Sequence, residues 1–177
     1  MFEAYFQALA QTSQSAHLMQ MFDGAVVRAH VSARGKRGQQ NQALGRSRGG
    51  FSTKIHIKTD FDRVPIASYL TAGVVSDCTQ LETSLDIGPG IKPRVALTDK
   101  GYDSAANRAA CRKRSILLVI PYRSNSNSRP SFFPKRLYKT RARVMQAIGK
   151  LKRFKRVTMR RGKPPRVTAR LSTSLAA

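Results

Sequence analysis

The order of strand-like and helix-like segments constrains the fold of this chain more than any other feature of its sequence. Residues 18–30 form an apolar run interrupted by Asp23, and residues 51–59 alternate apolar and polar side chains with a period of two. Continuous apolar runs are typical of buried strands, and strict alternation is typical of half-buried strands. Residues 64–71 have the pattern of a return strand after a turn at residues 60–63, so we expect three strands in succession.

The second half of the chain alternates between helix and strand patterns. We expect helices over residues 76–85, 104–114 and 135–154, and short buried strands over residues 95–98 and 116–120. We also expect a helix over residues 4–13 and a basic loop over residues 31–50. Three strands followed by alternating helices and strands predict an α/β fold, a mixed sheet with flanking helices, in the order of the ribonuclease-H-like fold.

The chain is strongly basic. It has 33 Lys and Arg residues against 9 Asp and Glu residues, a formal net charge of +24 at pH 7, and every carboxylate side chain lies at or before Asp103. Self-repulsion of this size destabilises a compact chain unless a polyanion neutralises it, so nucleic acid is the expected partner. On charge alone, a ribosomal or other RNA-packaging protein stays open as the alternative.

Composition excludes several other classes. The 177 residues suit one domain, and a hydrophobic fraction of 41% can support a core. Two cysteines, Cys78 and Cys111, and three histidines are too few for a disulfide framework or a structural zinc site, so we expect free thiols in a reducing cytoplasm. Apolar runs such as Ile116–Pro121 are far shorter than the roughly 20 residues of a membrane span.

Two aspartates are candidate site residues. Asp23 lies inside an apolar run, where an unpaired buried carboxylate is costly. Asp99 follows the strand expected at residues 95–98, and α/β sheets place ligands at the carboxyl ends of their strands. The alternatives are a polar residue buried by chance or an edge position for Asp23, and a turn or helix-cap residue for Asp99. Asp103 fits a cap or turn better than a metal ligand.

Five segments, in order, resemble the catalytic domain of bacterial insertion-sequence transposases of the DDE class. They are Met21–His30, Gln42–His56, Thr98–Asp103, Val119–Arg123, and Lys135–Lys139 leading into Leu151–Arg156. The resemblance covers residues 18–157 and implies three carboxylates that bind two Mg²⁺ (or Mn²⁺) ions. Such a pair of ions clamps the attacking and leaving oxygens of a phosphoryl displacement. The family motif places the first two carboxylates at Asp23 and Asp99.

The third carboxylate is where the chain departs from this family. The family signature on the last helix is a spaced set of Tyr, Arg, Glu and Lys, of which Tyr138, Arg141 and Lys152 are present. The Glu position is Met145, and nothing acidic follows Asp103. A thioether is a poor ligand for Mg²⁺, so we expect impaired catalysis. Without the resemblance, Met145 has the pattern of a core residue beside Val144 and Ile148.

The resemblance also implies DNA contacts by Tyr138, Arg141 and Lys152, with a solvated basic helix face as the alternative. Arg46, Arg48 and Lys54 are also expected to contact DNA, because they lie among glycines that let the backbone approach phosphate. The alternative is that they belong to a mobile surface loop. The expected partners are transposon ends and target DNA, bound by a homo-oligomer. The expected location is the cytoplasm, in association with the nucleoid, with no membrane partner.

Two regions are expected along the chain. Residues 1–157 would form the DDE catalytic domain without the family's N-terminal DNA-binding part, and residues 158–177 a basic tail. Pro164 and Pro165 would stop the helix that the resemblance implies there, so the tail is expected to be disordered or frameshifted. The predicted function is DNA transposition by metal-dependent phosphoryl transfer. The alternatives are a non-catalytic DNA-binding remnant and, less favoured, a basic RNA-binding protein.

Overall fold

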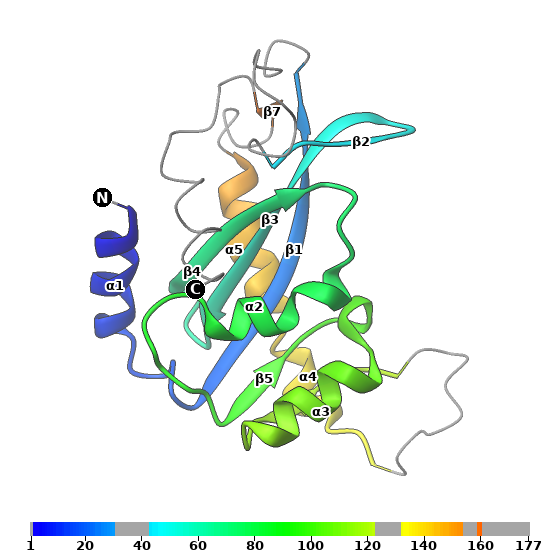
Figure 1. The fold of residues 1–177 in the computed structure, drawn as a ribbon. Coiled ribbons are helices and arrows are strands. Elements are labelled where there is room, and N and C mark those ends of the chain that lie inside the picture. The colour runs from blue at the N-terminus through cyan, green and yellow to red at the C-terminus, as the bar shows by residue number, and fades with distance from the viewer. Residues whose placement is uncertain (1, 31–42, 123–131, 154–158, 161–177) are drawn as a thin grey trace, which may run out of the picture. The chain divides into compact units, whose positions relative to one another are not determined.

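The computed structural model describes residues 2–30, 43–122, 132–153 and 159–160. Helices and strands follow one another along the chain as shown in Figure 1. They are α1 (Phe2–Thr12), β1 (Met19–Ala29), β2 (Gly45–Ser47), β3 (Gly50–Asp60), β4 (Pro65–Ala72), the 3-10 helix η3 (Asp77–Gln80), α2 (Leu81–Asp86), β5 (Val95–Leu97), the 3-10 helix η4 (Lys100–Tyr102), α3 (Ala105–Lys113), β6 (Leu117–Val119), α4 (Lys135–Lys139), α5 (Ala142–Arg153) and β7 (Met159–Arg160).

Strand pairing gives a mixed sheet. Among the described residues, seven strands pair in the order β2-β3-β1-β5-β6, with β4 also beside β3 and β7 also beside β1. The β2–β3 pair is antiparallel, whereas β5 is parallel to both β1 and β6. The predicted α/β class is therefore confirmed. The order β4-β3-β1-β5-β6 along this sheet is that of the ribonuclease-H-like fold.

The chain divides into two compact units. The first comprises Met1–Asp23, Ile57–Ser68 and Ser76–Ala147, and the second comprises Gly24–His56, Tyr69–Val75 and Ile148–Ala177. Strands β1, β3 and β4 and helix α5 contribute residues to both units. Among the described residues, no helix has the length and apolar content that a membrane crossing requires.

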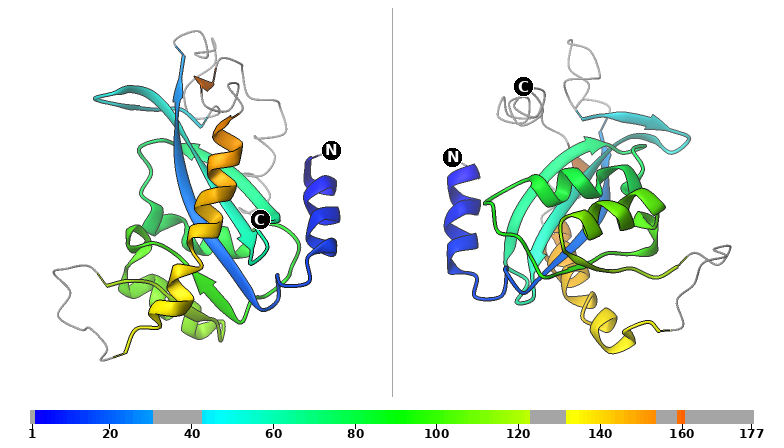
Figure 2. Two further views of the ribbon diagram at one scale, coloured as in Figure 1. Left: turned by 180° about the vertical axis from the view of Figure 1, so that it is seen from behind. Right: turned by 60° about the horizontal axis from the view of Figure 1, so that its bottom comes forward.

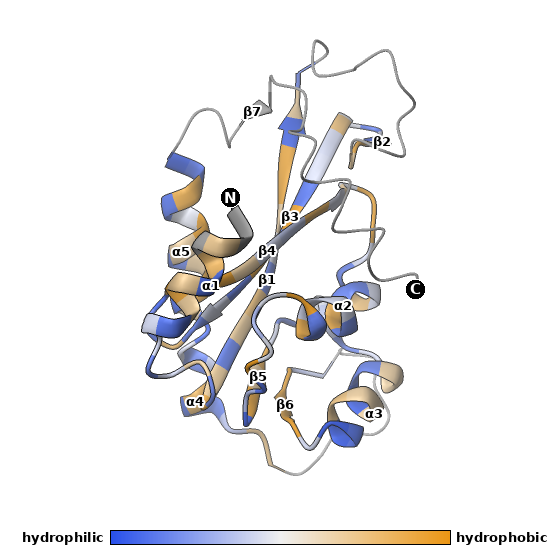
Figure 3. Ribbon diagram, turned by 60° about the vertical axis from the view of Figure 1, so that its left-hand side comes forward, coloured by the Kyte–Doolittle hydropathy of each residue, from blue (hydrophilic) through white to orange (hydrophobic). Residues whose placement is uncertain are grey.

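The core of the first unit lies between its sheet and two helices. It consists of Phe22, Leu81, Ala96, Tyr102, Cys111, Ile116 and Ile120, all buried. In this unit α2 and α3 lie on one face of β5 and β6, and α4 and the start of α5 lie on the other (Figures 1 and 2). Hydrophobic residues dominate β5 and β6, as Figure 3 shows. Short apolar strands are typical of parallel sheets, although Leu117 of β6 is exposed.

The second unit contains the β2–β3 hairpin and packs around polar residues of β3. The His56 ring stacks on Tyr69 with centroids 4.7 Å apart, and His56 Nε2 lies 2.9 Å from Thr71 Oγ1. Gly73 donates its N–H to the Ser52 carbonyl at 3.0 Å. A Cβ atom at Gly73 would lie 2.1 Å from Ser52 Oγ, so only glycine permits this approach.

One strand prediction and one loop prediction differ from the structure. The alternation over residues 51–59 predicted a half-buried strand, but both faces of β3 are covered along most of its length, and even Lys54, His56 and Lys58 are buried. Each of the two lysine ammonium groups donates to one backbone carbonyl. The basic loop predicted over residues 31–50 contains the short strand β2, and its residues 31–42 lie outside the described part.

Two helix predictions also differ. The helix predicted over residues 76–85 is divided into η3 and α2, and Ser76 precedes η3 without making a side-chain capping hydrogen bond. The helix predicted over residues 135–154 is divided into α4 and α5 at Thr140 and Arg141. Thr140 Oγ1 donates to the Leu137 carbonyl at 2.6 Å, and such local bonds compete with helical ones. The helix capped by Ser104 is confirmed as α3.

Candidate active site

The register of two parallel strands brings Asp23 and Asp99 together. Met19 pairs with Val95 and Met21 pairs with Leu97. Asp23 lies two residues after Met21, and Asp99 lies two residues after Leu97, so the two aspartates stand at corresponding positions. Because strand side chains alternate with a period of two, Asp23 lies on the same face as Met21. Both aspartates belong to the first unit.

A single guanidinium nitrogen contacts both carboxylates. Arg141 Nη2 lies 3.2 Å from Asp23 Oδ1 and 3.7 Å from Asp99 Oδ2. Arg141 precedes α5, and its side chain is 15% exposed, against 14% for Asp23 and 36% for Asp99. The two carboxylates are therefore close enough to share one cation, and in this structure that cation is Arg141.

The turn after β5 fixes the orientation of Asp99. Asp99 caps the N-terminus of η4, and its Oδ1 accepts a hydrogen bond from Gly101 N at 2.7 Å. A Cβ atom at Gly101 would lie 2.8 Å from the same Oδ1, so a larger residue would displace the carboxylate. The second oxygen, Oδ2, is the one near Arg141.

Helix α3 holds the segment that follows Asp99. The buried Asn107 Nδ2 donates to the carbonyls of Tyr102 and Cys78 at 2.7 and 2.8 Å. Asp103, which follows η4, is bound to Arg108 Nη2 at 2.9 Å, and the Arg108 guanidinium lies 3.7 Å from the centroid of the Tyr122 ring. Sequence reasoning missed Asn107 and Arg108, because their role depends on contacts across α3. Asp103 is placed in the turn, as expected.

Met145, which the resemblance predicts at the third carboxylate position, lies beside Arg141. It follows Arg141 by one helical turn, and its Sδ lies 3.7 Å from Arg141 Nη1. Met145 is 54% exposed, so its interpretation as a core residue was wrong. Val144, Ala147 and Ile148 form the buried face of α5 instead.

The donor set fits one hard cation and does not fit two. Among the described residues, no group of three or more His, Cys, Asp or Glu side chains could hold a metal ion. Mg²⁺ is commonly bound through one or two carboxylates plus water and substrate phosphate, which Asp23 and Asp99 satisfy. A two-ion site needs a further oxygen ligand, and the neutral thioether of Met145, the residue beside Arg141, does not supply one.

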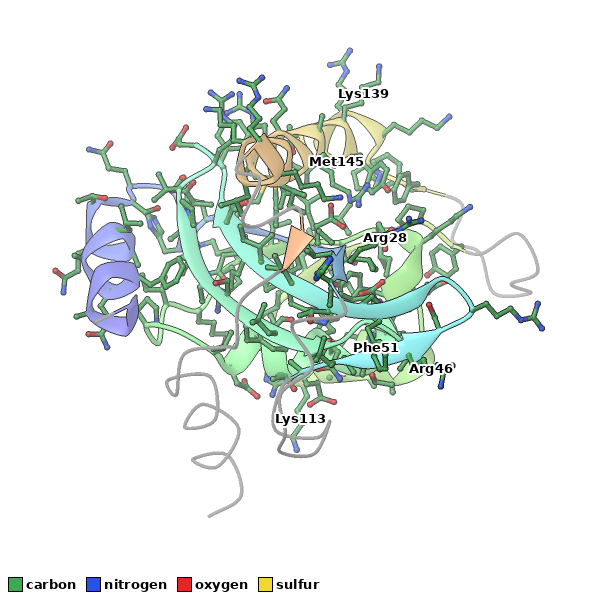
Figure 4. All side chains as sticks on the ribbon, turned by 90° about the horizontal axis from the view of Figure 1, so that it is seen from above. Arg28, Arg46, Phe51, Lys113, Lys139 and Met145 are labelled. Atoms are coloured by element: carbon green, nitrogen blue, oxygen red, sulfur yellow. The ribbon has the colours of Figure 1, made fainter. Side chains whose placement is uncertain are left out.

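The predicted DNA-contacting residues lie in different surroundings. Tyr138 is on α4, half-buried, with its ring 5.3 Å from that of Phe133. Lys139, one residue further along α4, projects outward from the helix (Figure 4). The remaining predicted contacts, Arg46, Arg48, Lys54 and Lys152, belong to the second unit.

Of the predicted DNA-contacting residues in the second unit, three are exposed and one is buried. Arg46 on β2 and Arg48 after it are exposed at the β2–β3 hairpin, where Arg46 pairs with Phe51 (Figure 4). Lys152 is exposed on α5. Lys54 is buried within β3 and donates Nζ to the Val75 carbonyl at 2.7 Å. This side chain supports the hairpin from inside the unit.

Comparisons with known proteins identify the family of this chain. The family model described as the transposase DDE domain matches residues 17–177. A putative transposase for insertion sequence element IS402 from Burkholderia cepacia is 41% identical over 80 residues. That match covers 40% of this chain and 38% of the relative.

Two solved structures share a weaker likeness. One is a simian T-cell lymphotropic virus intasome in complex with PP2A regulatory subunit B56 gamma (TM-score 0.40, 11% identity), matched over 82% of this chain and 47% of that one. The other is a Mos1 transposase paired-end complex with left transposon end (TM-score 0.36, 13% identity), matched over 84% and 59%. The chain thus spans less than two thirds of each relative. Because the family model covers most of its length, the chain belongs to the transposase DDE domain family.

Proposed function

We propose that this chain is the catalytic-domain portion of an insertion-sequence transposase, which cleaves transposon ends and joins them to target DNA by phosphoryl transfer. The observation that carries the proposal is the pair of carboxylates, Asp23 and Asp99, held at one cation position. Membership of the DDE family supports the same reaction.

Asp23 and Asp99 would hold a divalent cation, Mg²⁺ or Mn²⁺. When bound, such an ion neutralises charge on the phosphoryl group and lowers the pKa of water. Met145 adds no ligand oxygen and accepts no proton, so we propose that catalysis by this chain is impaired. The catalytic region would be residues 1–157, with residues 158–177 as a basic tail. Met159 and Arg160 of that tail form β7, and its last residues, 161–177, lie outside the described part.

DNA is the proposed partner of the basic residues. Arg46, Arg48, Tyr138, Arg141 and Lys152 would contact phosphates of transposon ends or target DNA, and Lys54 would hold the hairpin that carries the first two. The formal net charge of +24 favours a polyanion. We also propose that the protein acts on DNA as a homo-oligomer and that it is associated with the nucleoid in the cytoplasm.

Met145 favours a second candidate, a non-catalytic DNA-binding remnant of a transposase. Binding through basic side chains does not depend on the third carboxylate, whereas two-ion catalysis does. An RNA-binding protein is the less favoured third candidate, and it predicts no preference for terminal-repeat duplex over RNA of equal length.

Nicking of a plasmid that carries the element's terminal repeats tests the proposal. We would compare the present chain with Met145→Glu in the presence of Mg²⁺, and use Met145→Glu combined with Asp23→Asn as the inactive control. Cutting by Met145→Glu alone would support the assignment of Asp23, Asp99 and position 145. Equal cutting by the present chain would show that the third carboxylate is misplaced. Duplex binding without cutting by either chain would favour the remnant.

A further inference from the structure

We infer that Arg141 is a built-in counter-ion that competes with the divalent cation for Asp23 and Asp99, and that metal binding releases its guanidinium for a DNA phosphate. This inference rests on the proposed function, because it gives Arg141 two successive partners in the same reaction. In the free chain the guanidinium lies on the carboxylates. In the complex with cation and DNA, the two carboxylates would bind the cation and the guanidinium would bind a DNA phosphate.

The geometry shows that Arg141 occupies the place a cation would use. Its Nη2 is within 3.7 Å of one oxygen from each aspartate. The two carboxylates and the one guanidinium together carry one net negative charge. The neighbouring side chain, Met145, is neutral and 3.7 Å from Nη1. Arg141 therefore cancels half of the negative charge of these two carboxylates.

Competition follows from distance and charge. Mg²⁺ binds oxygen at about 2.0–2.1 Å and prefers a nearly octahedral shell. Asp23 Oδ1 and Asp99 Oδ2 cannot both bind a divalent ion while Arg141 Nη2 remains in contact with both oxygens. The guanidinium and the metal ion would then repel each other at contact distance. Metal binding therefore requires Arg141 to move from at least one carboxylate.

A phosphate is the partner to which the released guanidinium is best suited. Arginine presents parallel N–H donors that match phosphate oxygens. Arg141 Nε is buried and has no hydrogen-bond partner among the described residues, so its present position leaves a donor unused. A DNA phosphate could accept hydrogen bonds from guanidinium N–H groups, such as that of Nε, which the two carboxylates leave without a partner.

Exchange of partners makes metal binding and DNA binding cooperative. A cation on Asp23 and Asp99 frees Arg141 for phosphate, and phosphate on Arg141 clears the carboxylates for the cation. By thermodynamic linkage, each ligand strengthens the other by the same factor, typically about 5- to 150-fold. Without Arg141 this contribution to the coupling disappears.

The first test measures Mn²⁺ affinity of the chain without DNA, by electron paramagnetic resonance. Arg141→Gln is compared with Arg136→Gln, which removes the same charge from an exposed position on α4. We expect Arg141→Gln to bind Mn²⁺ about tenfold more tightly than Arg136→Gln, within the usual range of coupling between sites. Equal affinities in the two folded variants would overturn the competition.

A second measurement uses the unmodified chain, so its result does not depend on whether the Arg141→Gln variant folds. In side-chain ¹⁵N spectra, the Arg141 guanidinium should exchange with solvent slowly in the free chain and faster at saturating Mg²⁺. The Arg136 signal should be unchanged and serves as the internal control. An Arg141 signal that Mg²⁺ leaves unaffected at saturation would contradict the inference.

The second test separates the inference from the proposed function. Duplex affinity is measured with and without Mg²⁺ at constant ionic strength, for the unmodified chain, Arg141→Gln and Arg136→Gln. We expect Mg²⁺ to strengthen binding by the unmodified chain and Arg136→Gln, and to have no such effect with Arg141→Gln. Duplex binding with equal Mg²⁺ dependence in all three overturns the inference alone. Absence of duplex binding in all three overturns the proposed function, while the Mn²⁺ result still decides the competition.

Discussion

Lys58 is a buried ammonium group in the β3 strand of the first unit. Its side chain is 2% exposed, and Nζ donates to the Leu85 carbonyl at 3.2 Å. Burial lowers the pKa of Lys58 to about 8 from an ordinary value of 10.5, and the nearby Asp86 carboxylate opposes part of that shift. One carbonyl does not replace the water that a charged ammonium group loses on burial.

The pH dependence of stability should therefore carry a Lys58 component. Between pH 8 and pH 10.5 the folded chain has lost the Lys58 proton while the unfolded chain keeps it, so stability rises with pH over this window. We expect the free energy of unfolding, relative to Lys58→Met, to rise by on the order of 3 kcal/mol from pH 7 to pH 10.5. Urea unfolding of both chains at both pH values measures this, and a constant difference would show that Lys58 is solvated.

Cys111 should be unreactive for a related reason. It is fully buried in the core of the first unit, and burial raises the pKa of its thiol to about 11 against the opposing effect of Arg114. Since the thiolate is the reactive species, we expect a disulfide reagent at pH 8 to label half-buried Cys78 and to label Cys111 only after unfolding. Cys78→Ser should then show no labelling in the folded chain. Rapid labelling of that variant would contradict the burial of Cys111.

Sequence reasoning predicted individual site residues where a single residue departs from its surroundings. Asp23 stands out because a carboxylate interrupts an apolar strand, and Asp99 because it ends one. The parallel register then brings them together, although their catalytic role stays a prediction. The position of Arg141 between them, and the exposure of Met145, depend on where α4 ends and α5 begins. No local pattern encodes that orientation.

At the scale of elements, α3 illustrates how capping fixes a helix that supports the site. Ser104 Oγ accepts from Asn107 N at 3.1 Å at the start of α3. Ser104→Ala should lower the free energy of unfolding by about 1 kcal/mol, because a helical N–H loses its partner. Ser104→Asp keeps an acceptor and should lie within a few tenths of the unmodified chain. Thermal unfolding of the three chains measures this, and an equal loss in both variants would show that the hydroxyl has another role.

Element prediction succeeded where pattern and capping agree and failed where tertiary contacts decide. The apolar run of β1, the return strand β4 and the Ser-capped α3 all follow from local signals. The burial of β3 does not, because its alternating lysines predict a solvent-facing side, and their carbonyl partners, Val75 and Leu85, are distant in the sequence. The short strand β2 is specified by pairing with β3 rather than by its own residues.

At the scale of the whole chain, charge is the dominant quantity. The formal net charge is +24 over 177 residues. Charge of one sign repels itself in a compact state, and bound polyanions offset that repulsion. Binding through phosphates also releases counterions from nucleic acid, so affinity should fall by about 10³-fold or more between 50 and 200 mM salt if at least six phosphates are contacted.

Polyanion binding should consequently stabilise the folded chain as well as occupy its basic surface. Heparin or duplex DNA at about 100 times its dissociation constant adds about 2.7 kcal/mol by mass action. For a chain of this size that corresponds to a rise in Tm of roughly 5–10 °C. Differential scanning fluorimetry with heparin, duplex DNA and uncharged dextran measures the effect. Dextran should leave Tm unchanged, because it excludes volume without neutralising charge. Equal shifts with dextran and heparin would mean that compaction, rather than neutralisation of the positive charge, limits the stability of this chain.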